Sequence, residues 1–215
     1  MCLFTRINYT IGLLLYVLVS HPYSLNGNDT LPKNQDIVEV VSITFDKLED
    51  DWLQAEIGLR VGPKHPSLYN KPESHNPRYV DAIEMTLILS YKAPNAAKDF
   101  DYYRSTVAMP TLKRGPIHKI YFYLPGSIVK RDRLPREPDM YLVQISVNGL
   151  KLPGRPEHGK SGFFKKYGSI GINRYLAAAH SQALKNDGIL LPQYHAPLRF
   201  TSNLRETPSF IRRDL

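Results

Sequence analysis

Cysteine is almost absent from this 215-residue chain, and the only one is Cys2. A disulfide framework and a cysteine-based zinc site both need more thiols than that. A chain of this length can bury a continuous core without such cross-links. The seven histidines show neither His-x-His nor His-Glu-x-x-His spacing, and the chain has no Gly-x-Ser-x-Gly motif. The sequence therefore predicts a protein without metal, cofactor or enzymatic activity.

Negative charge is scarce in the second half of the chain. Residues 1–107 carry 10 Lys and Arg against 13 Asp and Glu, a net charge of −3, whereas residues 108–215 carry 18 against 7, a net charge of +11. This asymmetry favours an anionic partner. A solvated basic surface that keeps the protein soluble would explain it equally well.

Long hydrophobic runs are also lacking. The longest is 11–20 (IGLLLYVLVS), which follows Arg6 and precedes polar, turn-forming residues. Its length is about half of the roughly 20 residues that cross a bilayer as a helix, and it matches the core of a secretory signal. We predict a signal peptide at 1–24, with an uncleaved anchor as the alternative, and a linker at 25–36. An exported chain without disulfides suits a bacterial periplasm or outer envelope.

Alternating apolar residues dominate the next part of the chain. In the segment 53–61 five apolar residues alternate with polar residues or glycine, the period of a strand with one buried face. Further strands are predicted at 37–46, 79–91, 100–112, 117–124 and 140–147, with a short helix as the alternative at 100–112. Strands at this spacing, without helical periods between them, indicate an antiparallel sandwich.

Prolines and charges separate these strands. The segments 62–77 and 129–139 (VKRDRLPREPD) are predicted to be loops. After the last strand, Asn148-Gly149 predicts a type I′ hairpin turn.

A helix is predicted near the C-terminus. Residues 172–185 (INRYLAAAHSQALK) place apolar side chains at helical spacing, and Gly188 follows as a stop signal. The predicted domain is 37–191, including this helix near 172–186. The proline- and arginine-containing residues 192–215 are predicted to form an extended basic tail.

Residues 154–161 (GRPEHGKS) match the phosphate-binding pattern G-x-x-x-x-G-K-S. A working phosphate loop leaves a buried strand and runs into a helix whose N-terminus faces the phosphates. Here Pro153 precedes the loop, and Gly162 and Gly168 interrupt the place of the helix. We therefore predict no nucleotide site.

The densest basic clusters lie in two loops. They comprise Lys130, Arg131, Arg133 and Arg136, and separately Lys160, Lys165 and Lys166. A functional cluster of this kind would hold phosphate, sulfate or carboxylate through charge-assisted hydrogen bonds, and simple solvation is the alternative. Because we expect export, the predicted partners are envelope or pilus proteins or an acidic glycan, and not nucleic acid.

Aromatic residues gather in two of the predicted strands. They are Tyr102, Tyr103, Tyr121, Phe122 and Tyr123. Such rings offer stacking faces to sugars or bases. Since aromatics are typical of strands, we favour the interpretation that they belong to the core.

Several segments resemble a small exported immunoglobulin-like protein associated with type IV pilus genes of mucus-dwelling gut bacteria. They are IVEVVSITFDKLEDDWLQAEIGLRV, YVDAIEMTLILSY, FDYYRS and IYFYLPGSIVKRDRL, all within Ile37 to Leu152, together with the N-terminal signal. The resemblance implies an immunoglobulin-like sandwich with an accessory role at the envelope, and it supplies no site residues. The start of the chain lacks the cleavage motif and long apolar helix of a pilin, so we expect it not to be the polymerising subunit.

The sequence as a whole predicts a mainly β protein: an antiparallel immunoglobulin-like β-sandwich with one C-terminal helix and an extended basic tail. The function we expect is that of a non-enzymatic accessory or assembly protein of a type IV pilus or secretin-type complex. A binding module for acidic glycans is the first alternative. A secreted hydrolase, with carboxylates that converge from distant parts of the chain, is the second.

Overall fold

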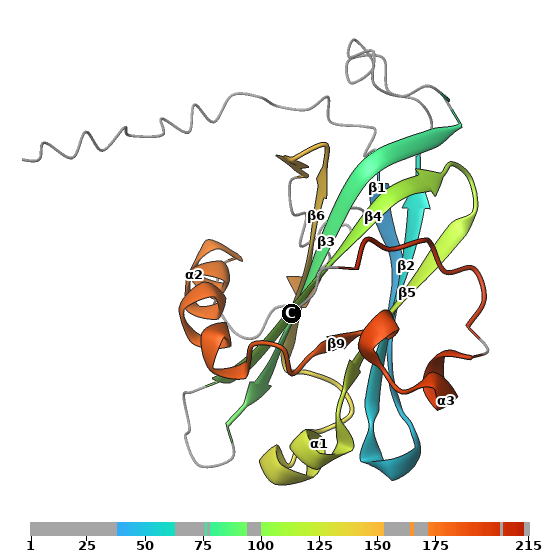
Figure 1. The fold of residues 1–215 in the computed structure, drawn as a ribbon. Helices are drawn as coiled ribbons and strands as arrows, with labels where there is room; N and C mark the ends of the chain where they lie inside the picture. Colours follow the sequence, from blue (N-terminus) through green and yellow to red (C-terminus); the bar gives the residue numbers. More distant parts are fainter. Residues whose placement is uncertain are drawn as a thin grey trace, which may run out of the picture. The chain divides into compact units, whose positions relative to one another are not determined.

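Two antiparallel β-sheets dominate the part of the chain that the structure describes (Figure 1). The structure, a computed structural model, describes residues 38–62, 76, 78–93, 100–152, 164–165, 172–202 and 204–212. The predicted signal peptide and linker, and the segment 154–161, lie outside the described residues. The predicted mainly β, antiparallel class is confirmed.

The six long strands lie where the sequence predicts them. Sheet A has the order β1 (Val38–Lys47), β2 (Leu53–Val61), β5 (Ile117–Leu124) and β9 (Leu191–Pro192). Sheet B has the order β4 (Phe100–Lys113), β3 (Tyr79–Lys92), β6 (Met140–Val147) and β7 (Leu150–Lys151), and β8 (Phe164–Lys165) also pairs with β6. The segment 100–112 is thus a strand. Asn148 and Gly149 have φ angles of 51° and 77°, as the predicted type I′ turn between β6 and β7 requires.

The main core is formed by alternate residues of the two sheets. Buried side chains include Leu53, Ala55, Ile57, Leu59 and Val61 of β2, and Ile83, Met85, Leu87, Leu89 and Tyr91 of β3. Removing this apolar surface from water is the main force that holds the sheets together. The five strand aromatics at 102, 103 and 121–123 are buried too, which confirms their interpretation as core.

A smaller core lies on the other face of sheet B. The helix α2 (Ile172–Gln182) and the following η3 (Ala183–Asn186) form where the sequence predicts a helix. Their Tyr175, Ala179 and Ala183 pack against Ile88 and Leu142, and Figure 1 shows α2 on the side of sheet B that faces away from sheet A. Sheet B is therefore buried on both faces only at the end that α2 covers. None of the described helices is long and apolar enough to cross a membrane.

A short helix, α1 (Gly126–Asp132), corrects the prediction of a loop at 129–139. The helix follows Pro125 and contains no proline, and its only glycine is its first residue. Arg133 ends the helix in a left-handed conformation with a φ angle of 52°. Gly126 allows the helix to approach η1 (Glu49–Asp51), because a Cβ at this position would overlap the backbone oxygen of Asp50. Only the residues after Arg133 keep the irregular form that the sequence predicts.

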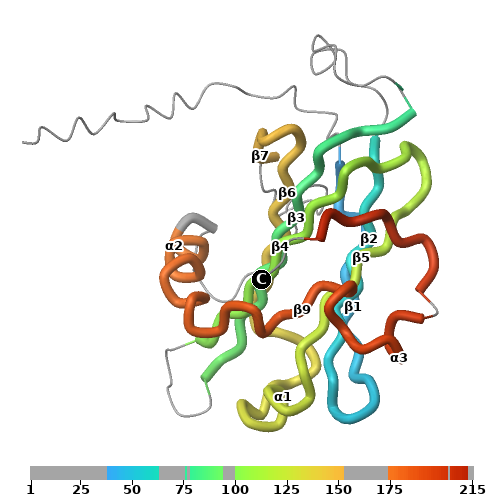
Figure 2. The backbone as a smooth tube through the Cα atoms, in the orientation of Figure 1, coloured from blue at the N-terminus to red at the C-terminus, as the bar shows by residue number. Residues whose placement is uncertain are grey.

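The C-terminal segment lies against the sheets, which corrects the prediction of an extended tail from 192. The strand β9 pairs with β5, η4 (Gln193–His195) and α3 (Leu198–Thr201) follow, and the backbone N–H of Ile211 donates to Ala108 O of β4 at 2.8 Å (Figure 2). Apolar side chains explain this order: Tyr194 and Phe210 pack on the main core. We call residues 187–202 and 204–212 the C-terminal strap.

Candidate functional site

The first predicted basic cluster gathers at α1, but acidic residues accompany it. Lys130 Nζ lies 2.9 Å from Asp51 Oδ2, and Arg131 Nε lies 2.7 Å from Asp132 Oδ1. Arg136 Nη2 lies 3.6 Å from Glu137 Oε1, and Arg133 is exposed. This surface therefore carries mixed charge rather than bare positive charge.

The pKa values at α1 reflect this pairing. Hydrogen bonds from Lys47 and Lys130 lower the pKa of Asp51 to about 2. The Arg131 guanidinium and the Tyr103 hydroxyl, which donates to Asp132 Oδ2 at 2.8 Å, lower the pKa of Asp132 in spite of its partial burial. The role of this cluster in binding an anionic partner stays a prediction.

The second predicted basic cluster is largely outside the described residues. Lys160 and Lys166 are not described, and Lys165 is described only as part of β8, which pairs with β6. The structure therefore does not bring the two basic clusters together within its described part.

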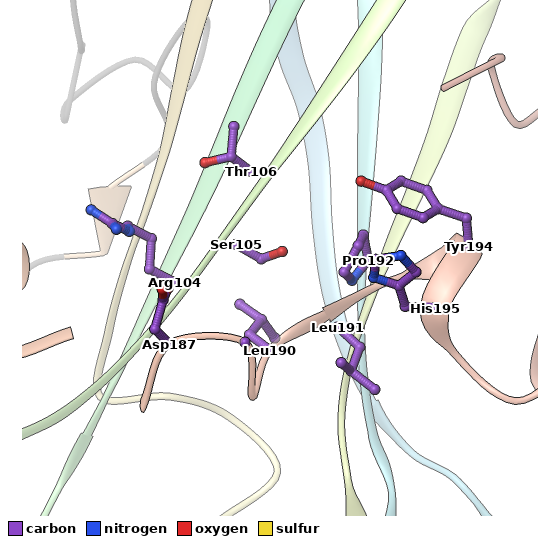
Figure 3. A pocket seen from close by; sticks show the side chains of 10 residues that line it. Arg104, Ser105, Thr106, Asp187, Leu190, Leu191, Pro192, Tyr194 and His195 are labelled. Carbon is purple, nitrogen blue, oxygen red and sulfur yellow. The ribbon is translucent and has the colours of Figure 1, made fainter. Parts of the chain in front are cut away.

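A different surface, at the edge of β4, contains two adjoining pockets. The inner pocket, of about 200 Å³, lies between Arg104–Thr106 of β4 and residues 187–195 of the C-terminal strap (Figure 3). The outer pocket, of about 190 Å³, lies on the face of sheet B next to α2. Both are lined by Arg104 and Thr106, so they meet at this strand edge. We call the two pockets together the β4 groove.

The inner pocket combines apolar walls with a few polar groups. Leu190, Leu191 and Pro192 line it from the C-terminal strap, and Asp187 of the strap lines it too. Figure 3 shows Ser105 directed toward the strap side, where Tyr194 and His195 lie. The Nδ1 atom of His195 is buried and has no hydrogen-bond partner among the described residues. A buried polar atom of this kind is costly unless a ligand or water satisfies it.

The outer pocket is polar. It lies where α2 leaves sheet B uncovered, and its lining includes Glu84, Thr86, Thr106, Gln144, Lys151 and His180. The hydroxyls of Thr86 and Thr106 lie 2.8 Å apart, and Arg104 Nη1 lies 3.4 Å from His180 Nδ1. Two permanent cations, Arg104 and Lys151, thus face one carboxylate, that of Glu84. The arrangement suits an uncharged polar or an anionic ligand.

The backbone of β4 is accessible in the groove. Asn186 Nδ2 donates to Tyr102 O at 3.0 Å, and Ile211 N–H donates to Ala108 O, so both carbonyls point away from β3. Alternate residues of a strand direct their backbone groups to the same side. The N–H and C=O groups of Arg104 and Thr106 therefore also point away from β3. Within the described part of the chain, no strand pairs with β4 at these two residues.

Sequence reasoning did not identify the β4 groove. Its residues come from β3, β4, β6, β7, α2 and the C-terminal strap, and no two of its charged residues form a recognisable motif. Among the described residues, no group of three His, Asp or Glu side chains is placed to hold a metal ion. A groove with polar and apolar walls and an unpaired strand edge is suited to binding.

Comparisons with known proteins show a structural likeness but no family. No family model matches the chain, and no curated protein matches it. A protein of Akkermansia muciniphila, known from its crystal structure, matches with a TM-score of 0.57 at 16% identity, over 82% of this chain and 92% of that chain. This bacterium lives in the mucus of the gut. At such low identity, the likeness concerns the fold alone.

Proposed function

We propose that this chain is a non-enzymatic, exported protein of the bacterial cell envelope, built on an immunoglobulin-like sandwich, that assists the assembly of a type IV pilus or secretin-type complex. The observation that carries the proposal is the shared fold with a protein of A. muciniphila over most of both chains. The sequence resemblance to a pilus-associated protein of mucus-dwelling gut bacteria points the same way. The β4 groove supplies a surface for a partner.

The proposal is tested by chemical cross-linking in intact cells, followed by affinity recovery of this chain and mass spectrometry. Exposed lysines such as Lys130, Lys92 and Lys151 would react with the cross-linker. We expect recovery of pilus or secretin subunits joined through these lysines, and recovery of the chain in the envelope fraction. Recovery of the chain alone, or only with abundant cytoplasmic proteins, would overturn the proposal.

A module for acidic glycans is the second candidate. The tyrosines that would stack against sugar rings are buried, which removes one of the two features on which the sequence based this candidate, the other being the basic residues. The outer pocket is what favours it now, since hydroxyls, the Gln144 amide and two cations line it. Binding of an oligogalacturonate that persists at physiological salt, and that is lost on Lys151→Glu substitution, would support this candidate. Loss of all binding near that salt concentration would indicate unspecific charge attraction.

A further inference from the structure

We infer that the β4 groove binds an extended peptide segment of a partner protein, which adds as a strand to the edge of β4 and places an acidic side chain beside Arg104. The inference rests on the proposed function, because it names the kind of ligand that an assembly protein of this build would take. It concerns a surface outside the basic clusters that the sequence indicates.

The first step of the argument is the strand edge itself. Contacts with Asn186 and Ile211 cover β4 at Tyr102 and Ala108, respectively. Between these two positions, the outward backbone groups of Arg104 and Thr106 face the groove. An accessible strand edge pairs readily with another extended chain, which gains main-chain hydrogen bonds there.

The second step concerns the side of the incoming strand that faces the inner pocket. Successive side chains of a strand point to opposite faces, so every second residue of the partner would face Ser105 and the apolar wall at Leu190 (Figure 3). A small residue with a hydroxyl group at this position would fit the apolar wall and could form a hydrogen bond with Ser105.

The third step concerns the side chains that face the outer pocket. There the partner would meet Arg104, Lys151 and His180, with Glu84 as the opposing acid. A guanidinium group forms its strongest hydrogen bonds with a carboxylate. An acidic residue of the partner is therefore favoured over a basic one. Asp187 lines the inner pocket and would disfavour an acid on the face of the same strand that enters it.

The inference is tested with two labelled ten-residue peptides in fluorescence anisotropy at physiological salt. One alternates threonine and glutamate, and the other alternates threonine and lysine. We expect the glutamate peptide to bind at least about tenfold more tightly, as one charge-assisted hydrogen bond would provide. Equal binding of the two peptides would overturn the inference.

Two pairs of variants locate the site. Arg104→Glu should weaken binding of the glutamate peptide about tenfold, whereas Arg136→Glu, the same charge change at an exposed residue beyond α1, should alter it less than twofold. In a Cys2→Ser background, a bulky maleimide on Ser105→Cys should block binding, and the same label on Thr44→Cys, an exposed position of β1, should not. If both members of either pair lose peptide binding equally, the assignment of the site is wrong, provided that circular dichroism shows that each variant is folded.

Two further results separate this inference from the proposed function. If oligogalacturonate binds more tightly than the glutamate peptide and depends on Arg104, the groove is a glycan site and the peptide inference falls. If Arg104→Glu leaves the cross-linked partners in cells unchanged, the proposed function stands and the groove inference falls. If the unaltered chain recovers no envelope partner while the glutamate peptide still binds, the proposed function alone falls.

Discussion

The hydroxyl of Tyr175 in α2 lies 2.7 Å from Ser90 Oγ in β3, and both side chains are fully buried. Ser90 is the only buried polar side chain of the described residues outside the tyrosines. Burial raises the pKa of Tyr175 above its ordinary value, so the phenol stays neutral over the physiological pH range. This hydrogen bond joins α2 to sheet B beside the apolar contacts of Tyr175, Ala179 and Ala183.

Replacing either partner of this hydrogen bond should destabilise the protein by about 1 kcal/mol, because a buried hydroxyl loses one of its hydrogen bonds. We expect Ser90→Ala and Tyr175→Phe each to lower the free energy of unfolding by this amount in urea titrations. The double variant should lose less than the sum of the two. Strict additivity in this double-mutant cycle would show that the two hydroxyls do not interact.

Gly126→Ala should destabilise the protein by about 1–3 kcal/mol. The added methyl group would overlap the backbone oxygen of Asp50, which cannot move without displacing η1. Its neighbour Ser127 is exposed, so Ser127→Ala serves as the control and should change stability by less than about 0.5 kcal/mol. Similar melting temperatures for the two variants would contradict the close contact of α1 with η1.

Acid should destabilise the contact of α1 with η1. In the folded protein Lys47 and Lys130 hold the pKa of Asp51 at about 2, below its ordinary value of about 4. A lowered folded-state pKa contributes stability above the unfolded-state pKa, and this contribution disappears as the pH falls from about 4 to about 2. The melting temperature of Asp51→Asn should therefore depend less steeply on pH in this window. Asp46 is an exposed carboxylate of β1, so Asp46→Asn is the control. If this variant reduces the pH dependence of the melting temperature equally, Asp51 is not the group responsible.

Fluorescence of Trp52, the only tryptophan, should report the docking of α3. Phe200 lies 5.3 Å from the Trp52 ring and is stacked on Tyr123 at 6.1 Å, measured between ring centroids. Phe200→Ala should shift the emission of Trp52 to longer wavelength and lower stability by about 1–2 kcal/mol, because aromatic pairs contribute beyond their buried area. Leu198, on the same short helix, is 82% exposed, so Leu198→Ala should change neither the emission of Trp52 nor the stability of the protein. An unchanged emission in Phe200→Ala would show that α3 does not dock there.

Much of the two-sheet fold could be predicted because its signal is local. The alternation from Leu53 to Val61 matches β2 residue for residue, and the predicted turn at Asn148-Gly149 has the φ angles that the type I′ turn requires. Two predictions failed where the cause is not local. The first is the loop predicted at 129–139, because the basic residues there are typical of a loop. In the structure the helix α1 contacts η1, some 75 residues earlier in the chain.

The prediction of an extended C-terminal tail was wrong for a related reason. Its apolar residues stand singly among prolines and arginines and show neither a period of two nor a period of 3.6, so the sequence resembles a tail. The partners of Phe200 and Phe210 belong to β5 and the core, which are formed by residues far away in the sequence. No pattern in the strap itself encodes those contacts.

The sequence by itself determined the strands, their buried faces and the C-terminal helix, since each depends on the spacing of side chains within a dozen residues. Only the tertiary structure decided which charges are paired and where a binding surface lies. Lys130 belongs to a basic run in sequence, but its partner Asp51 comes from η1, far earlier in the chain. Arg104, Lys151 and His195 are far apart in sequence, and they line one groove because the sheets and the strap bring them to the edge of β4.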